Sequence, residues 1–252
     1  MAQDAARKAR KTISRGHGLI SAAAAFAFAA LLAFGGYQAV VHPDTPLPPQ
    51  WNPTEPLVIS DPVTPLTGWK LNRAVADPAT CLATLEGFAT LIPLDPLEEN
   101  DQCFISDRVD LQRVGQSLLA PVETRCAIAL RMAMWERHSV QPAAREFFGT
   151  DVARIQHIGS YNCRRLRTPD GPSARMSTHA TADAIDITGF DLVDGTRLRL
   201  IEDWGFGDSR AAFLRAVRDG ACDYFSLTLS PDYNRLHADH FHLQSRGWGL
   251  CR

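Results

Sequence analysis

The sequence lacks the short motifs of several common enzyme classes. It has no glycine-rich phosphate loop of either common type, no G-x-S-x-G nucleophile elbow and no CxxC pair. Nucleotide-dependent chemistry, an acyl-enzyme route through serine and a cysteine-based zinc knuckle are therefore without support. The formal net charge is only −2, so no excess of basic residues indicates a partner, and we expect no nucleic acid.

The composition is that of a globular protein, with 45% hydrophobic and 21% charged residues in a chain of 252. This length suffices for one domain of ordinary size with extra segments, or for two small domains. Charge, proline and cysteine are unevenly distributed along the chain. They divide it into a basic tail at 1–17, an apolar run at 18–41, a proline-rich linker at 42–68 and a folded part at 69–252.

The apolar run at 18–41 contains no charged residue over 24 positions, which is long enough to span a bilayer as a helix. The basic residues that precede it predict a cytoplasmic N-terminus and an exported C-terminal body. A cleaved signal peptide is the alternative, although its apolar region is usually only ~7–15 residues long. We therefore favour an uncleaved membrane anchor.

The linker at 42–68 contains eight of the sixteen prolines, a density that favours extended, semi-rigid chain. Such a spacer suits a protein that must reach something beyond the bilayer. All six cysteines follow the anchor, and an even number in an exported domain predicts disulfides in an oxidising compartment. The sequence does not choose among the 15 pairings that six cysteines allow.

The folded part predicts an α+β domain with a small, mainly antiparallel sheet flanked by helices. We expect Gly149 to stop one helix, and Asp208 or Ser209 to cap another that Gly220 ends. The predicted helices are 78–91, 122–140, 141–149 and 208–222, and the predicted strands are 152–163, 183–192, 196–204 and 237–244.

Histidine is concentrated in the stretch RLHADHFHLQ, which holds three of the eight histidines. On a strand, His240 and His242 share one face, and Phe241 and Leu243 point the other way into a core. An isolated HxH pair of this kind is more often exposed or structural than a metal site. On its own it is a weak signal.

A second stretch, STHATADAID, strengthens the metal hypothesis because it supplies His179 and Asp186. Asp186 lies among apolar residues of a predicted strand, where a carboxylate is costly to bury unless it is paired or bound to metal. Pairing with an arginine or capping a turn is the alternative. Together with His242, these residues would give two histidines, one carboxylate and an open position, the pattern of catalytic zinc.

The two motifs S-x-H-x-x-A-x-A-x-D and H-x-x-H-x-H resemble the zinc peptidases of the LAS group. That group includes D-alanyl-D-alanine carboxypeptidases, penicillin-insensitive murein endopeptidases and the hedgehog signalling fold. More closely, SYNCR, STHATADAIDITGF, FLRAV and HADHFHL resemble the bacterial extensin-like C-terminal domain family over roughly residues 70–252. The resemblance implies that His179, Asp186 and His242 hold Zn²⁺. A glycine is usual at the position of Ala182, where a positive φ would strain alanine.

The resemblance also implies that His240 is the catalytic histidine and His237 a further active-site histidine. Some relatives use an acid three residues before the last ligand, and Asp239 occupies that place. Extending strand parity back from His242 puts Asp239 on the face of Phe241. We therefore expect His240 to be the base and Asp239 to support it.

Arg164 falls where related peptidases carry an arginine for the substrate carbonyl or carboxylate, and Arg165 and Arg167 are neighbouring alternatives. Zinc, a histidine base and an arginine suffice for hydrolysis without a nucleophilic side chain. The resemblance thus implies a zinc-dependent hydrolase of the D,D-peptidase or murein endopeptidase type. It would act on peptide bonds of cell-wall peptidoglycan, from an inner-membrane anchor with its folded domain in the periplasm.

Two other functions fit the same residues. The first is a non-catalytic, zinc-stabilised module that binds or scaffolds the cell wall, because the hedgehog fold keeps its metal without obvious peptidase use. The second is a disulfide-held structural protein with no metal. An intact base and an oxyanion-binding cation distinguish the enzyme from the first of these, and His240 and Arg164 are the candidates for these two parts.

Overall fold

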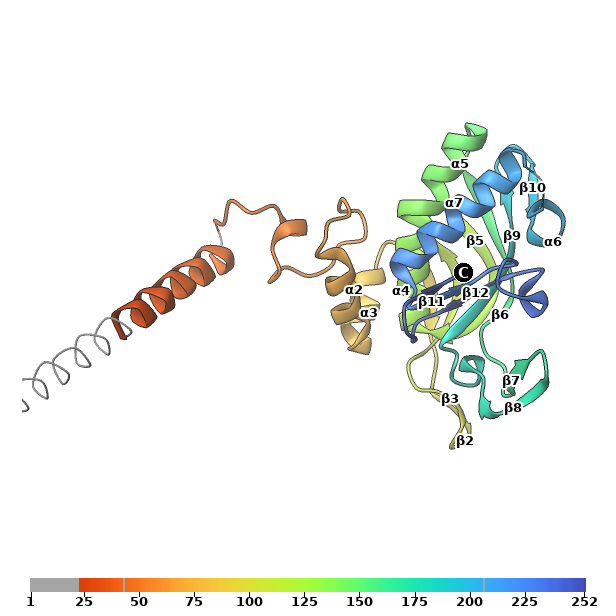
Figure 1. Cartoon of the computed structure of the whole chain (residues 1–252), viewed down its shortest axis with the longest axis horizontal. Coiled ribbons are helices and arrows are strands. Elements are labelled where there is room, and N and C mark those ends of the chain that lie inside the picture. Colours follow the sequence, from red (N-terminus) through yellow and green to blue (C-terminus); the bar gives the residue numbers. More distant parts are fainter. Residues whose placement is uncertain (1–22, 43, 206) are drawn as a thin grey trace, which may run out of the picture. The chain divides into compact units, whose positions relative to one another are not determined.

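The computed structural model describes residues 23–42, 44–205 and 207–252 (Figure 1). The chain divides into two compact units, of which the first ends at Glu55 and the second spans Pro56–Arg252. The predicted basic tail at 1–17 and the start of the predicted anchor lie outside the described residues. Leu57 and Ile59 are buried in the core of the second unit. The second folded unit therefore begins at Pro56, which lies inside the predicted linker.

The first unit contains an apolar helix, Ala23–Val41, whose 19 residues carry no charge. At ~1.5 Å per residue it is about 28 Å long, close to the thickness of a bilayer core. Its length and composition are those of a single membrane span or of a signal sequence. A short 3₁₀ turn, Pro49–Trp51, follows it.

The second unit is an α+β fold built on a mixed, mainly antiparallel sheet. Within the described residues, nine strands form this sheet. Eight follow the order β1-β4-β5-β6-β9-β12-β11-β13, and β10 pairs with β9. Among the strands described, only β5–β6 and β11–β13 pair in parallel. Two small hairpins, β2–β3 and β7–β8, stand apart from the sheet (Figure 1). The strands are β1 Ala89–Pro93, β2 Leu97–Asn100, β3 Cys103–Ile105, β4 Arg108–Val114, β5 Ser117–Arg125, β6 Val152–Gly159, β7 Arg165–Thr168, β8 Gly171–Met176, β9 Ala184–Leu192, β10 Arg197–Arg199, β11 Leu227–Leu229, β12 Phe241–Gln244 and β13 Leu250–Cys251.

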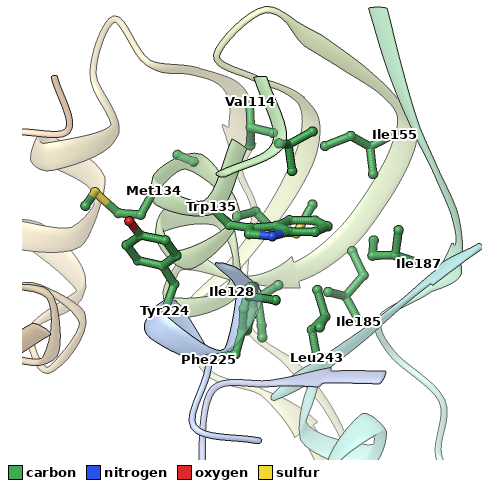
Figure 2. Close-up of a cluster of buried hydrophobic side chains, with 14 of the residues drawn as sticks. Val114, Ile128, Met134, Trp135, Ile155, Ile185, Ile187, Tyr224, Phe225 and Leu243 are labelled. Carbon is green, nitrogen blue, oxygen red and sulfur yellow. The ribbon is translucent and has the colours of Figure 1, made fainter. Parts of the chain in front are cut away.

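Helices α4, α5 and α7 lie on one side of the sheet (Figure 1). Trp135 of α4 is fully buried there, and its indole lies among strand side chains that include Val114, Ile155 and Ile187 (Figure 2). Its ring NH is satisfied because it donates to the carbonyl oxygen of Val217 at 2.8 Å. The helices of this unit are α2 Thr67–Val75, α3 Pro78–Leu85, α4 Cys126–Trp135, a π-helical segment Glu136–Val140, α5 Gln141–Phe148, α6 Leu200–Asp203 and α7 Ser209–Tyr224.

All six cysteines are paired, as the sequence predicts. One disulfide joins α3 to α4, a second joins β3 to the segment before β7, and a third joins α7 to β13. The bonds are Cys81–Cys126, Cys103–Cys163 and Cys222–Cys251.

The structure confirms the α+β class and the strands centred on β6 and β9. It also confirms the helix α7, whose first N–H groups bond to the Asp208 side chain, and the end of α5 at Gly149, which has φ = 68°. Gly220 does not end α7. A Cβ there would lie 2.3 Å from Ser139 Oγ, so this glycine permits close contact with the π-helical segment. The helix continues to Tyr224.

Other element predictions are wrong in part, among them the strand predicted at 237–244, of which only Phe241–Gln244 forms a strand. The helix predicted at 78–91 ends at Leu85, because Gly87 turns the chain with φ = 77° into β1. Residues 122–125 belong to β5, where Val122 and Thr124 are buried in alternation. The strand predicted at 196–204 becomes helical after Arg199, whose backbone N–H donates to Asp203 Oδ2 at 2.8 Å.

Candidate metal centre

Two neighbouring strands bring Asp186 and His242 together. β9 and β12 are antiparallel, with His242 directly opposite Asp186, so both side chains emerge on the same face. The residues that flank them, including Ile185, Phe241 and Leu243, are fully buried on the opposite face. Strand parity predicts this arrangement, and the apolar flank fixes its register.

His179 reaches the same place from the short 3₁₀ turn Thr178–Thr181 that precedes β9. The side chain of Ser177 accepts a hydrogen bond from the His179 backbone N–H and so caps the turn. Ala182 then turns the chain into β9 with φ = 49°, ψ = 30°, the left-handed region that normally favours glycine. It is the one described residue other than glycine with positive φ. The loop therefore keeps the backbone that glycine would allow.

The three side chains converge on one point. His179 Nε2 lies 3.1 Å from His242 Nδ1 and 3.2 Å from Asp186 Oδ2, while His242 Nδ1 lies 2.9 Å from Asp186 Oδ1. All three residues are at least nine-tenths buried. One ligand atom from each falls within 4.8 Å of the others, which is a grouping that could hold a metal ion.

In each of the two imidazoles, the outer nitrogen is the one that faces away from Asp186. The partner of that nitrogen fixes the tautomer of the ring. His179 Nδ1 lies 2.7 Å from the Ser160 carbonyl oxygen, and His242 Nε2 lies 2.9 Å from Gln244 Oε1. Oxygens of this kind only accept, so both outer nitrogens donate. In the neutral rings, the inner nitrogens then face each other as two lone pairs beside a carboxylate. Such a donor set fits a divalent cation, and zinc binds imidazole and carboxylate together.

The charge state of Asp186 also favours a cation at this point. Burial raises the pKa of Asp186, but the hydrogen bonds and charges of His179 and His242 outweigh it and hold that pKa far below its usual range. The carboxylate is thus ionised at any physiological pH. This lowering of the pKa depends on positive charge at the inner ring nitrogens, which a proton there or a bound cation would supply.

His240 lies just outside this group. Its Nδ1 donates to Asp239 Oδ1 at 2.7 Å, and its Nε2 faces Asp186 Oδ1 at 3.6 Å. The prediction that Asp239 shares the face of Phe241 is wrong, because β12 begins only at Phe241 and strand parity does not extend to the turn before it. Asp239 lines the cleft beside His240 instead.

His237 completes the histidine cluster, with ring centroids 5.3 Å from His240 and 5.8 Å from His242. Its Nδ1 donates to Asn234 Oδ1 at 2.8 Å, which leaves Nε2 as an acceptor. Burial, followed by the charges of His242 and His240, lowers the pKa of His237 to about 4. His237 is therefore a neutral imidazole near pH 7.

Arg164 lines the same cleft, directly after Cys163 and its disulfide to β3. Burial, and then the nearby charge of Arg167, lower the pKa of Arg164, whereas Asp186 raises it. Among the described residues, Arg164 forms no ion pair with a carboxylate. The cleft has a volume of about 980 Å³ and is lined by every predicted site residue except His179.

A family profile described as "Extensin-like protein C-terminus" matches residues 79–252. The chain belongs to this family. All seven predicted site residues lie inside the matched segment. No curated protein and no solved structure matches the chain significantly.

The extensin-like domain also holds its site with residues that the sequence analysis does not single out. Gln244 Oε1 accepts from both His242 and Thr178 Oγ1, and Gln244 Nε2 donates to the Arg246 carbonyl. Strand parity could have revealed Gln244, because it follows His242 by two positions. No sequence signal identifies the Ser160 carbonyl, since any residue carries one.

Proposed function

We propose that this chain is a membrane-anchored, zinc-dependent hydrolase that acts on peptide bonds of cell-wall peptidoglycan. The observation that carries the proposal is the convergence of His179, Asp186 and His242 on one buried point, with both outer ring nitrogens bonded to oxygens and the Asp239–His240 pair next to them. The motif resemblance to LAS zinc peptidases supports the same reaction class. The relation to that group is part of the proposal.

Each residue has a part in the proposed reaction. A zinc ion held by His179, Asp186 and His242 would supply Lewis acidity, which lowers the pKa of water from 15.7 to about 7 and polarises a carbonyl. His240 Nε2, directed inward by the Asp239 bond, takes a proton from the attacking water. The water oxygen bonds to the carbonyl carbon, the C–N bond breaks, and the proton passes to the leaving amine.

Two further groups favour the transition state over the bound substrate. The Arg164 guanidinium, which forms no ion pair with a carboxylate among the described residues, stabilises the negative charge that develops on the carbonyl oxygen. Neutral His237 offers Nε2 as an acceptor for an N–H of the substrate, because its Nδ1 is already bonded to Asn234. Neither role requires a covalent enzyme intermediate.

The test is hydrolysis of purified sacculi by the full chain in detergent with zinc, read by mass spectrometry of the released muropeptides. We expect new products that each gain one water at an amide, and none from His242→Ala. Zinc at about one ion per chain with no product would favour the wall-binding alternative. If neither the unmodified chain nor His242→Ala binds zinc, both the hydrolase proposal and the wall-binding alternative are contradicted.

The proposed location rests on the apolar helix and the basic flank before it. A reporter enzyme that works only after export, fused after Arg252, should be active in an inner-membrane, periplasm-facing topology. The mature protein should also stay in the membrane fraction. A soluble product that begins near residue 40 would identify the helix as a signal sequence instead.

A further inference from the structure

The cleft beside the candidate metal centre carries an excess of positive charge, although the whole chain is slightly negative. Its acids are already engaged: Asp186 with two histidines and Asp239 with His240. One of its arginines, Arg246, is neutralised by Asp183, with Nη2–Oδ2 at 2.6 Å. The described lining arginines that remain are Arg164, Arg167 and Arg175.

Two of these arginines belong to the β7–β8 hairpin that follows β6 (Figure 1). Among the residues that the structure describes, neither Arg167 nor Arg175 forms an ion pair or a side-chain hydrogen bond. The neighbouring Arg165 differs, because its Nη1 donates to the Ala174 carbonyl at 3.0 Å and it does not line the cleft. The hairpin therefore directs two of its arginines to the cleft and uses the third for its own structure.

Like charges held close together without an acid are unfavourable in the free protein. The repulsion reaches Arg164, whose pKa is lowered first by burial and then by the charge of Arg167. An anion placed between such guanidiniums would relieve the repulsion and accept charge-assisted, bidentate hydrogen bonds. An acidic ligand would thus account for cleft arginines that have no acidic partner in the described part of the chain.

We propose that Arg167 and Arg175 form an anion subsite that binds a carboxylate of the substrate outside the bond that is cut. The inference rests on the proposed hydrolase function and adds the substrate class, an acidic peptide. Arg164 serves the reacting carbonyl, and the two hairpin arginines hold the substrate in register. They act as specificity-determining residues.

A pair of labelled peptides tests this directly. One is a cell-wall stem peptide with free carboxylates, and its twin has the same sequence with every carboxylate amidated. Binding is measured by fluorescence anisotropy on the zinc-loaded full chain in detergent. We expect the acidic peptide to bind ~10-fold or more tightly than its twin, the scale of charge-assisted hydrogen bonds, and the preference to weaken with salt.

The double variant Arg167→Gln/Arg175→Gln should lose most of this preference at unchanged zinc content. The matched control is Arg165→Gln, which removes one positive charge from the same hairpin outside the cleft and should keep the preference. In turnover, the double variant should raise KM and leave kcat nearly unchanged. A preference that persists in the double variant, or equal binding of the two peptides by the unmodified chain, would overturn the proposal.

The anion subsite and the hydrolase activity can be tested independently of each other. Carboxylate-dependent binding without hydrolysis would leave the subsite intact and remove the hydrolase. Hydrolysis without a preference for carboxylates would support the hydrolase and rule out the subsite. Competition by inorganic phosphate at concentrations similar to the peptide would show that the two arginines prefer phosphate groups, which would also overturn the carboxylate assignment.

Discussion

The imidazole of His240 donates from Nδ1 to Oδ1 of Asp239 at 2.7 Å. This bond fixes the tautomer and turns the Nε2 lone pair toward Asp186, 3.6 Å away. A carboxylate in this position also stabilises the imidazolium that forms when His240 takes a proton. Asp239 therefore acts through His240, as a positioning residue.

Replacing Asp239 by asparagine removes the charge and leaves a side chain of similar size. We expect kcat to fall by ~10-fold or more, a fraction of the ~10²–10⁴-fold that proton transfer contributes. Zinc content should stay the same, and the acid limb of the pH–rate profile should move to lower pH. The control is Asp232→Asn, since Asp232 bonds to Trp204 Nε1 outside the cleft. An unchanged pH profile would show that Asp239 is only structural.

His242→Ala and His240→Ala separate metal ligand from base. The first removes one of three buried donor atoms, so zinc occupancy and activity should both collapse. The second leaves the three donors in place, so zinc should remain at about one per chain while activity falls by ~10²-fold or more. Elemental analysis beside a turnover assay decides between them. Loss of zinc in His240→Ala with retention in His242→Ala would reverse the two roles.

Gln244→Ala tests the support of the metal site. Without Gln244 Oε1, His242 Nε2 loses its acceptor and the ring is free to rotate. Loss of such a partner typically weakens metal binding by ~10–100-fold, and we expect a loss of that size in zinc competition against a chelator. Gln156→Ala is the matched control, because Gln156 bonds to Asp191 away from the site. Equal zinc affinity in both variants would contradict this role.

His138 predicts a pH dependence of stability that is independent of the metal site. Burial and the charge of Arg137 lower its pKa, although its hydrogen bond to the Ile59 carbonyl raises it. The unfolded chain then binds a proton below about pH 6.5 that the folded chain does not. Stability should be independent of this group above that pH and should fall as the pH drops through it.

Thermal melting of the full chain between neutral and mildly acidic pH measures the effect. His138→Gln should lose part of the acid destabilisation, by at most about 1.4 kcal/mol per pH unit. His157→Gln is the control, because the half-buried His157 likewise bonds to a backbone carbonyl, that of Ala120. Identical pH slopes for His138→Gln and the unmodified chain would show that His138 titrates normally.

The sequence predicts which faces of the two strands in the candidate metal centre are buried, because both strands alternate between apolar and polar residues. Asp186 interrupts an apolar strand, and His242 alternates with Phe241 and Leu243, so burial and register follow from period two. The role of Asp239 could not be obtained in this way. It depends on where β12 begins, and the turn of Asn234–Asp239 is set by side-chain contacts from Asn234.

The sequence-based prediction misses the strands before α4, although Val109 and Leu111 alternate with polar residues in β4. That alternation was a usable signal. Gly220 could not have been read correctly, because a glycine that ends a helix and one that admits a neighbouring segment look alike in sequence. Only the position of Ser139, far away in the chain, distinguishes them.

The left-handed Ala182 has a consequence for how the chain tolerates insertions and deletions. One residue added or removed between Ala182 and Asp186 would turn Asp186 into the core and an isoleucine into the cleft. The β7–β8 hairpin is different, because hydrogen bonds from Ser177 to Arg164 and from Asn162 to His179 clamp both of its ends. Its length and sequence can vary while Arg164 and His179 keep their places. The hairpin is therefore the segment in which substrate preference could be redesigned without rebuilding the metal centre.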